Sequence, residues 1–190
     1  MQADRTSKFC RACGSPTEAR LPDDGDSKLR AVCTACATVH YVNPLNVVGT
    51  IPIWSSANGP QVLLCKRNIE PRKGKWTLPA GFMEMGESAA QGAARETVEE
   101  AGATFTMGPL FSLISVTHVG QVHFFYQATL TSDQFDPGIE TQEAKLFSAA
   151  DIPWDELAFR TVKETLALYF DTAHGDSASA QGLVHELVIG

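Results

Sequence analysis

The chain has 190 residues, a formal net charge of −7, 44% hydrophobic residues and 19% charged residues. This composition is typical of one globular domain of ordinary size with a small appendage, and it excludes a disordered chain. The acidic charge gives no general attraction for nucleic acid or for an anionic membrane, and no apolar run approaches the ~20 residues of a membrane helix. The N-terminus lacks the apolar stretch of a secretory signal, so we expect a cytoplasmic protein.

Four of the five cysteines fall near the N-terminus, in two Cys-x-x-Cys pairs separated by 19 residues: Cys10, Cys13, Cys33 and Cys36. This spacing lies in the range of a zinc ribbon. Four thiolates complete a tetrahedral Zn²⁺ and leave no open position, so the predicted zinc is structural. Redox pairs and disulfides are the alternatives, but a reducing compartment disfavours disulfides. Because the segment has few apolar residues, we expect it to need the metal to fold.

Residues 47–54 and 61–67 are apolar, β-branched runs on either side of an Asn-Gly turn, and they predict a β-hairpin. The loop that follows is polar and basic. We expect most of it to be solvated, with one or two basic side chains, Arg67 and Arg72 among them, in contact with an anionic substrate. A short strand then covers residues 76–82, in which Pro79 fixes the backbone and Gly81 permits a close approach.

A helix is predicted next, over the alanine-rich residues 89–101. Ser88 is the expected N-cap, Gln91 completes a capping box, and Gly102 is well placed to end the helix.

Successive helical residues turn by ~100°, which sorts this helix into two faces. One face is charged and carries Arg95, Glu96, Glu99 and Glu100. Val98 and the small residues form the opposite, core-facing arc, and Gly92 is expected to leave room for a ligand beside Glu96. Stacked carboxylates repel each other unless a hard divalent cation neutralises them. A solvated acidic face is the alternative that such a charge run leaves open.

The stretch around this helix resembles the Nudix box: a glycine, five residues, a glutamate, seven residues, then Arg-Glu-apolar-x-Glu-Glu-x-Gly-apolar. Every charged and glycine position of that pattern is present: Gly81, Glu87, Arg95, Glu96, Glu99, Glu100 and Gly102. Two apolar positions are weak, because Thr97 and Ala103 are smaller or more polar than the usual residues, but these positions concern packing.

The resemblance implies an α/β fold, the Nudix α/β/α sandwich, in which a mixed sheet lies between helices. It also implies a hydrolase of nucleoside diphosphate derivatives that uses Mg²⁺ or Mn²⁺. The metal would be held by Glu96, Glu99 and Glu100 and by backbone carbonyls at Ala80 and Gly81. In the family pattern Arg95 pairs with Glu87 and orients the ligands. The box itself leaves the identity of the general base open.

Residues 110–117 and 121–130 predict two further strands, and residues 144–147 predict another. Within the loop before the last strand, the resemblance implies a glutamate that reaches the metal site as ligand or base. Glu143 is our choice and Glu140 the alternative, with a surface carboxylate also open. Trp76 is a candidate for stacking on a base, although the core is its favoured place, and Phe82 is a candidate substrate contact. One of the aromatic residues Phe124, Phe125 and Tyr126 could also stack on an adenine. His118 and His123 are interpreted as ordinary surface or strand residues.

Residues 153–171 predict a second helix, because apolar residues recur at helical spacing. We divide the chain into a zinc ribbon at residues 1–42, a Nudix domain at 43–172 and a flexible tail at 173–190. The apolar end of the tail could dock on a second subunit, and we expect a homodimer.

Together the cysteines and the box resemble the zinc-ribbon branch of the Nudix hydrolases. The Ser-Gln-Pro-Trp-Pro-Phe run that marks NADH enzymes of this branch does not follow the box. The segments at residues 40–54 and 152–170 resemble the sub-branch associated with ADP-ribose and FAD, which we therefore expect as substrates, with NADH next. A non-catalytic module that binds nucleotide or nucleic acid is the rival interpretation, but such a protein should show gaps in the box.

Overall fold

The computed structural model describes residues 7–174 and 184–190. The chain divides into two compact units. The first holds the residues up to Pro44 together with His118–Gly120, and the second holds the rest of the chain from Leu45 on. Each unit is described by itself. Our expectations for the first six residues and for most of the tail, at 175–183, lie outside the described residues.

The first unit is a small antiparallel sheet of three strands, β1 (Thr17–Arg20), β2 (Arg30–Cys33) and β3 (Val39–His40), with β2 in the middle. Its buried hydrophobic residues are few: Cys10, Ala31, Val32 and Cys33. So small a core cannot stabilise a sheet alone, and half of it consists of cysteines. This small core agrees with the expectation that the segment needs a metal to fold, which stays a prediction.

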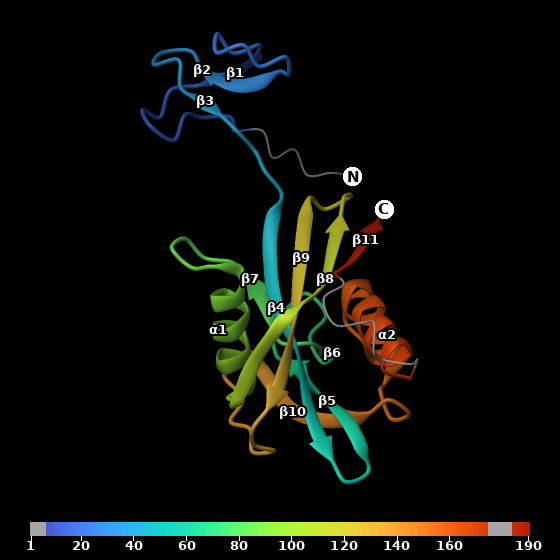
Figure 1. The fold of residues 1–190 in the computed structure, drawn as a ribbon. Coiled ribbons are helices and arrows are strands. Elements are labelled where there is room, and N and C mark those ends of the chain that lie inside the picture. Colours follow the sequence, from blue (N-terminus) through green and yellow to red (C-terminus); the bar gives the residue numbers. More distant parts are fainter. Residues whose placement is uncertain (1–6, 175–183) are drawn as a thin grey trace. The chain divides into compact units, whose positions relative to one another are not determined.

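The second unit is built on one mixed sheet of eight strands (Figure 1). Six of them follow the order β10-β5-β4-β9-β8-β11, while β6 pairs with β5 and β7 with β4. The β4–β9 and β8–β11 pairs are parallel and the others antiparallel. The bounds of the strands are β4 (Leu45–Ser56), β5 (Gly59–Arg67), β6 (Trp76–Thr77), β7 (Ala80–Phe82), β8 (Phe105–Val116), β9 (Gln121–Leu130), β10 (Thr141–Ser148) and β11 (His185–Ile189).

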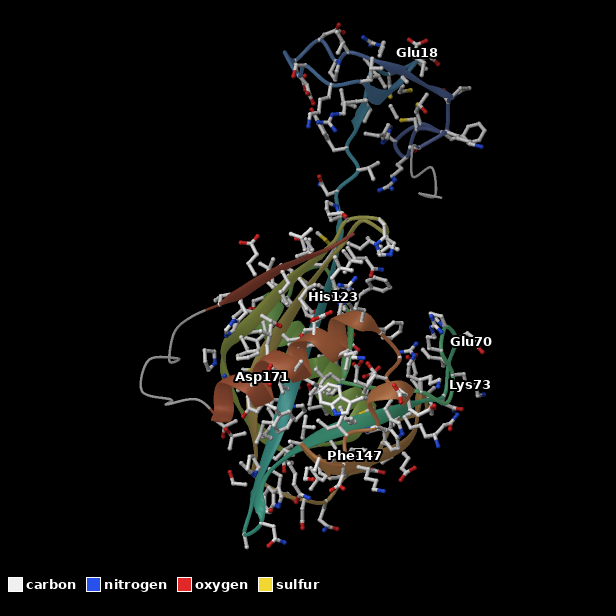
Figure 2. The ribbon with its side chains drawn as sticks, turned by 90° about the vertical axis from the view of Figure 1, so that its right-hand side faces the viewer. Glu18, Glu70, Lys73, His123, Phe147 and Asp171 are labelled. Atoms are coloured by element: carbon white, nitrogen blue, oxygen red, sulfur yellow. The ribbon has the colours of Figure 1, made fainter. Side chains whose placement is uncertain are left out.

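Two helices, α1 (Ala89–Ala101) and α2 (Arg160–His174), lie on opposite faces of this sheet (Figures 1 and 2). The sheet therefore has a core on each side. β5 shows this directly, because Val62 and Leu64 belong to the core on the α2 side and Leu63 and Cys65 to the core beside α1. Alternation with a period of two puts these neighbours on opposite faces. The expected α/β/α sandwich with a mixed sheet is confirmed.

The limits of α1 follow the sequence closely. Ser88 accepts a hydrogen bond from the backbone N–H of Gln91, whose side chain accepts one from the N–H of Ser88, so the capping box is present. Gly102 ends the helix in the left-handed conformation at φ 58°. A side chain at that φ would be strained, and here a Cβ would also lie 2.2 Å from the carbonyl oxygen of Asp136.

The orientation of α1 corrects two expectations. Val98 is 54% exposed rather than buried, because the helix turns Thr97 and Glu100 toward the sheet. The Thr97 hydroxyl lies 2.7 Å from that of Thr50 on β4, which fixes this rotation. Gly92 is buried and leaves no room for a ligand, since a Cβ there would lie 2.5 Å from Oε1 of Glu87. The space beside Gly92 is filled by the protein's own carboxylate.

Two other segments differ from the sequence expectation. The helix predicted from residue 153 begins only at Arg160, and a short 3-10 turn at Trp154–Glu156 precedes it. The intervening chain bonds instead to β6, where the N–H of Ala158 donates to the carbonyl of Trp76. The end of the chain, which we placed in the tail, forms β11 in the same sheet, parallel to β8, and buries Ile189. It therefore docks on its own domain.

Candidate active site

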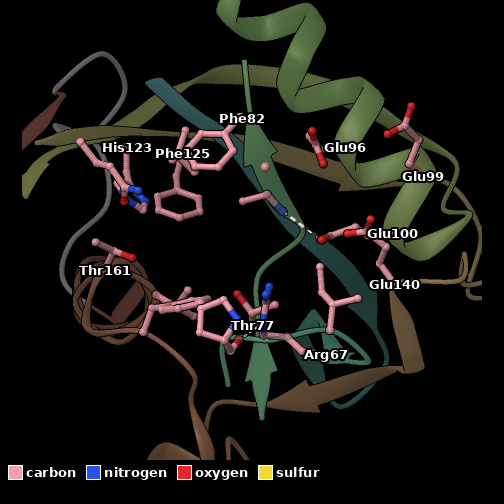
Figure 3. Close-up of a pocket in the computed structure, with 18 of the residues that line it drawn as sticks. Arg67, Thr77, Phe82, Glu96, Glu99, Glu100, His123, Phe125, Glu140 and Thr161 are labelled. Carbon is pink, nitrogen blue, oxygen red and sulfur yellow. Dashed lines mark hydrogen bonds between the residues drawn. The ribbon is translucent and has the colours of Figure 1, made fainter. Parts of the chain in front are cut away.

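A cavity of about 740 Å³ opens in the second unit beside the Nudix-like stretch. Its lining comes from α1, β7, β9, the beginning of α2 and the two loops that contain Arg67–Pro71 and Ile139–Glu140. Figure 3 shows two contrasting ends. Glu96, Glu99, Glu100 and Glu140 lie at one end, and Phe82, His123, Phe125 and Thr161 lie toward the other.

The acidic end is built by the close approach of β7 to α1. The backbone N–H of Ala80 donates to Oε2 of Glu100 at 3.0 Å. A Cβ on Gly81 would lie 2.4 Å from the carboxyl carbon of Glu96, so only glycine lets this carboxylate sit against the strand. The start of β7 thus brings the backbone against two carboxylates. Metal ligation by the backbone carbonyls of Ala80 and Gly81, which the box resemblance implied, stays a prediction.

Arg95 is the residue that organises the charged face. Its guanidinium donates to both oxygens of Glu87, at 3.1 and 2.9 Å, and this is the ion pair that we expected. It also donates to Glu96 at 2.7 Å and to Glu99 at 3.1 Å. The hydrogen bonds from Arg95 hold the pKa of Glu87 below its usual value, and the same bonds raise the pKa of Arg95. The guanidinium of Arg95 therefore forms hydrogen bonds with three carboxylates of its own chain.

Burial perturbs the carboxylates at this end. It raises the pKa of Glu100 to about 7, although the N–H of Ala80 opposes the shift. It also raises the pKa of Glu96, against the hydrogen bond from Arg95. Bringing carboxylates into a shared low-dielectric wall is unfavourable unless positive charge joins them. Arg67 is another cationic group, and its charge lowers the pKa of Glu100, which opposes the effect of burial.

The oxygen-rich wall suits a hard divalent cation in its donor chemistry. Three box carboxylates share it, and one of them, Glu100, is 8% exposed with no cationic side chain in hydrogen-bond contact among the described residues. Among the described residues these carboxylates do not gather as tightly as ligands around an ion, and Arg95 pairs with both Glu96 and Glu99. A cation would therefore compete with Arg95 for the oxygens of Glu96 and Glu99.

The basic residues that we expected near the substrate separate in the structure. Arg67 lines the cavity, with its guanidinium carbon 5.1 Å from the ring centroid of Phe159 and its Nε donating to the carbonyl of Pro71. Arg72 lies further along the loop and is not part of the lining. The guanidinium of Arg67 is thus positioned by an aromatic face and a backbone carbonyl, which leaves other donors for an anion.

The glutamates of the later loop also separate. Glu140 lines the cavity, whereas Glu143 is exposed on β10, where it pairs in register with Lys66 and lies outside the lining. The loop that carries Glu140 is tied to residue 68, because the side chain of Asn68 donates to the carbonyl of Ile139 and its N–H donates to that of Glu140. Of the two glutamates that we named, the alternative, Glu140, is therefore the one that lines the cavity.

The aromatic candidates divide in the same way. Phe82 lines the cavity, while Trp76 is buried in the core with an edge-on contact to Phe147, 4.9 Å between centroids. Sequence reasoning missed His123, which lines the cavity and has its pKa lowered to about 4 by burial. The period of two along β9 could have found it, because Gln121, His123 and Phe125 share the face that lines the cavity.

The four N-terminal cysteines meet as predicted. Their sulfur atoms lie within 4.8 Å of one another, with Sγ–Sγ distances of 3.7 Å for Cys10–Cys36 and 3.5 Å for Cys13–Cys33. Four thiolates at ~2.3 Å from one zinc would be about 3.8 Å apart, so the cluster fits a tetrahedral ion. Backbone N–H groups of Ala12 and Ala35 donate to sulfur, and the hydroxyl of Thr38 helps to lower the pKa of Cys36 to about 6. These bonds favour thiolates.

In the part of the chain that the structure describes, no helix is long and apolar enough to cross a membrane.

Comparison with known proteins agrees with this geometry. The NUDIX domain model matches residues 45–169, and the Nudix N-terminal zinc-ribbon model matches residues 8–42. A crystal structure of a NUDIX hydrolase from Nitrosomonas europaea is similar, with a TM-score of 0.86 and 44% identity over 96% of this chain and 99% of that one.

Two curated relatives are both named NAD-capped RNA hydrolase NudC. The one from Haemophilus influenzae (strain PittGG) is 34% identical over 52% of this chain, and the one from Photobacterium profundum is 29% identical over 89% of it. The chain spans 34% and 62% of the lengths of these relatives. The matches to the domain model and to the full length of the Nitrosomonas enzyme show that this chain belongs to the Nudix family and carries that family's N-terminal zinc ribbon.

Proposed function

We propose that this protein hydrolyses the phosphoanhydride of a nucleoside diphosphate derivative with the help of Mg²⁺ or Mn²⁺. The observation that carries the proposal is the acidic end of the cavity, where Glu96 and Glu100 lie against the backbone of β7 and the pKa of Glu100 is raised. Such a wall needs a cation, and a diphosphate bound beside it brings further negative charge that the same cation neutralises.

Glu96, Glu99 and Glu100 would hold the divalent ion, together with backbone carbonyls at Ala80 and Gly81. When bound, the ion polarises the phosphoryl group and lowers the pKa of a coordinated water. The protein's own groups do the remaining work. Arg95 positions the carboxylates through Glu87, Arg67 offers donors to phosphate oxygens, and Glu140 faces the cavity as the candidate base from outside the box.

For the substrate we propose ADP-ribose or FAD first and NADH second, as the resemblance of residues 40–54 and 152–170 suggests. The size of the cavity, about 740 Å³, suits a compound of this class. The relatives' name adds NAD-capped RNA as a further candidate, because an NAD cap presents the same kind of diphosphate. The net charge of −7 does not favour a polyanion, so we rank the small molecules higher. The homodimer remains a prediction.

The test is a substrate screen with Mg²⁺ or Mn²⁺. Purified protein is incubated with ADP-ribose, FAD, NADH and an NAD-capped oligonucleotide, and products are separated by chromatography. We expect AMP or a 5′-monophosphate end as a product, and a loss of at least about 100-fold in kcat/KM for Glu100→Gln. If the wild type releases no product from any of these compounds, the proposal fails.

We further propose that the cysteine cluster holds one structural Zn²⁺, because its sulfur separations fit a tetrahedral site. Metal analysis of the purified protein should give about one zinc per chain. A folded ribbon with essentially no bound metal would contradict this assignment.

A further inference from the structure

The end of the cavity away from the glutamates contains two polar atoms whose hydrogen-bonding capacity is unused. Nδ1 of His123 and Oγ1 of Thr161 are buried, and neither has a hydrogen-bond partner among the residues that the structure describes. Thr161 as a whole is 5% exposed, and both residues belong to the cavity lining. A buried polar group without a partner is unfavourable, so two of them in one wall call for an explanation.

Apart from Gln121, whose carboxamide lies beside His123, the residues named here at this end are apolar and aromatic. Phe125 lies beside His123, with 6.2 Å between the ring centroids, and Phe82 lies over the same part of the cavity (Figure 3). Val47 and Val162 complete the wall. Flat apolar walls with a few polar atoms are typical of sites for planar heterocycles, whose faces pack on aromatic rings while their edges make hydrogen bonds.

The hydrogen-bond pattern narrows the kind of heterocycle. Nε2 of His123 lies 3.1 Å from the carboxamide oxygen of Gln121, so Nε2 carries the proton in the neutral ring. Burial lowers the pKa of His123 to about 4, which keeps the ring neutral near pH 7. Nδ1 is then an acceptor that needs an N–H donor, and the hydroxyl of Thr161 can donate to an acceptor next to it.

We propose that His123 and Thr161 form the polar edge of a nucleobase subsite that selects adenine by its amino group and adjacent ring nitrogen. The inference deepens the proposed function and rests on it for the identity of the substrate. With the diphosphate beside the glutamates, the cavity leaves the opposite end for the base. A carbonyl in place of the amino group would set acceptor against acceptor at His123.

Mononucleotides test the subsite without turnover, because they contain no phosphoanhydride. Binding of AMP, IMP, nicotinamide mononucleotide and ribose 5-phosphate is measured by calorimetry with Mg²⁺. We expect AMP to bind at least about 10-fold more tightly than IMP, and ribose 5-phosphate to bind most weakly. Tighter binding of nicotinamide mononucleotide than of AMP would assign this end to the other heterocycle, and equal binding of AMP and ribose 5-phosphate would remove the subsite. Either outcome overturns the proposal.

Thr161→Val is the decisive variant, because valine keeps the shape of threonine and has a methyl group in place of the hydroxyl. We expect AMP affinity to fall about 3- to 10-fold, which corresponds to one neutral hydrogen bond, with ribose 5-phosphate unaffected. The melting temperature should stay the same or rise, because the hydroxyl has no partner in the free protein. If Thr161 were only structural, Thr161→Val would lower the melting temperature and leave the AMP affinity unchanged.

Thr165→Val is the matched control on the same helix. Thr165 is fully buried and its hydroxyl lies 3.2 Å from that of Ser112, outside the cavity lining. This variant should lose stability and keep its AMP affinity. If Thr161→Val binds AMP as tightly as the wild type does, the assignment of Thr161 to the polar edge of the subsite is wrong. If AMP binds as described but no diphosphate compound is hydrolysed, the proposed reaction fails and the subsite stands.

Discussion

Glu100→Gln should remove a pH dependence of stability from the metal-free protein, while it lowers kcat/KM by at least about 100-fold. The pKa of the buried carboxyl is raised from 4.5 to about 7. Because the folded pKa lies above the unfolded one, the folded state binds the proton more tightly. The contribution of Glu100 to stability is therefore greatest below pH 4.5 and is lost as the pH rises to 7. Between pH 5 and pH 8 this loss amounts to about 2 to 3 kcal/mol.

Glutamine removes this pH dependence because it does not ionise. Its oxygen can still accept from the N–H of Ala80, and the burial of its amide group affects stability equally at both pH values. The stability of the variant relative to the wild type should therefore rise by about 2 to 3 kcal/mol from pH 5 to pH 8, or roughly 5 to 10 °C in melting temperature.

Tryptophan fluorescence is a suitable probe of the second unit, because that unit contains all three tryptophans of the chain: Trp54, Trp76 and Trp154. Divalent ions should be removed by buffer exchange rather than by a strong chelator, which would also strip zinc from the ribbon. Adding Mg²⁺ should then stabilise the wild type more than the variant. An equal offset between variant and wild type at pH 5 and pH 8 would refute the reasoning. Glu143→Gln makes the same substitution at an exposed site and is the control.

Further predictions concern the site and the ribbon. Glu140→Gln should lower kcat/KM by about 10- to 100-fold and Glu143→Gln by less than about 2-fold, since only the former lines the cavity; steady-state kinetics that reverse this order would contradict the placement. Gly81→Ala should lower kcat by at least about 100-fold with a folded circular dichroism spectrum, because the new Cβ would displace the carboxylate of Glu96; full activity would refute the close approach. Cys33→Ser should abolish stoichiometric zinc binding by metal analysis, whereas Cys65→Ser, in the buried core, should keep it.

Local chemistry made several elements predictable from sequence. The capping box at Ser88 and the left-handed glycine at Gly102 fix the ends of α1, because both depend on contacts within a few residues. The hairpin of β4 and β5 follows in the same way from its Asn-Gly turn, and the limits of β9 at Gln121 and Leu130 match the prediction. Within each Cys-x-x-Cys pair the two cysteines are also close in sequence, and this spacing predicted the cluster.

Expectations that depended on long-range packing were less accurate. The segment before α2 forms backbone bonds to β6 rather than a helical turn, and β11 completes the sheet of its own domain; neither partner is near in sequence. The choice between Glu140 and Glu143 has the same origin. Both lie near the start of β10, and only the hydrogen bonds from Asn68 show which of them the loop presents to the cavity.

The charged helix shows how the two kinds of information divide. By itself the sequence determined that Arg95, Glu96, Glu99 and Glu100 share a face and belong to a Nudix box, because helical periodicity and spacing are properties of the chain. Tertiary structure decided how far that face is buried. The contact between Thr97 and Thr50 rotates Glu100 inward, against the N–H of Ala80, and exposes Val98. Burial raises the pKa of Glu100, and burial depends on the strands that pack against the helix rather than on the helix itself.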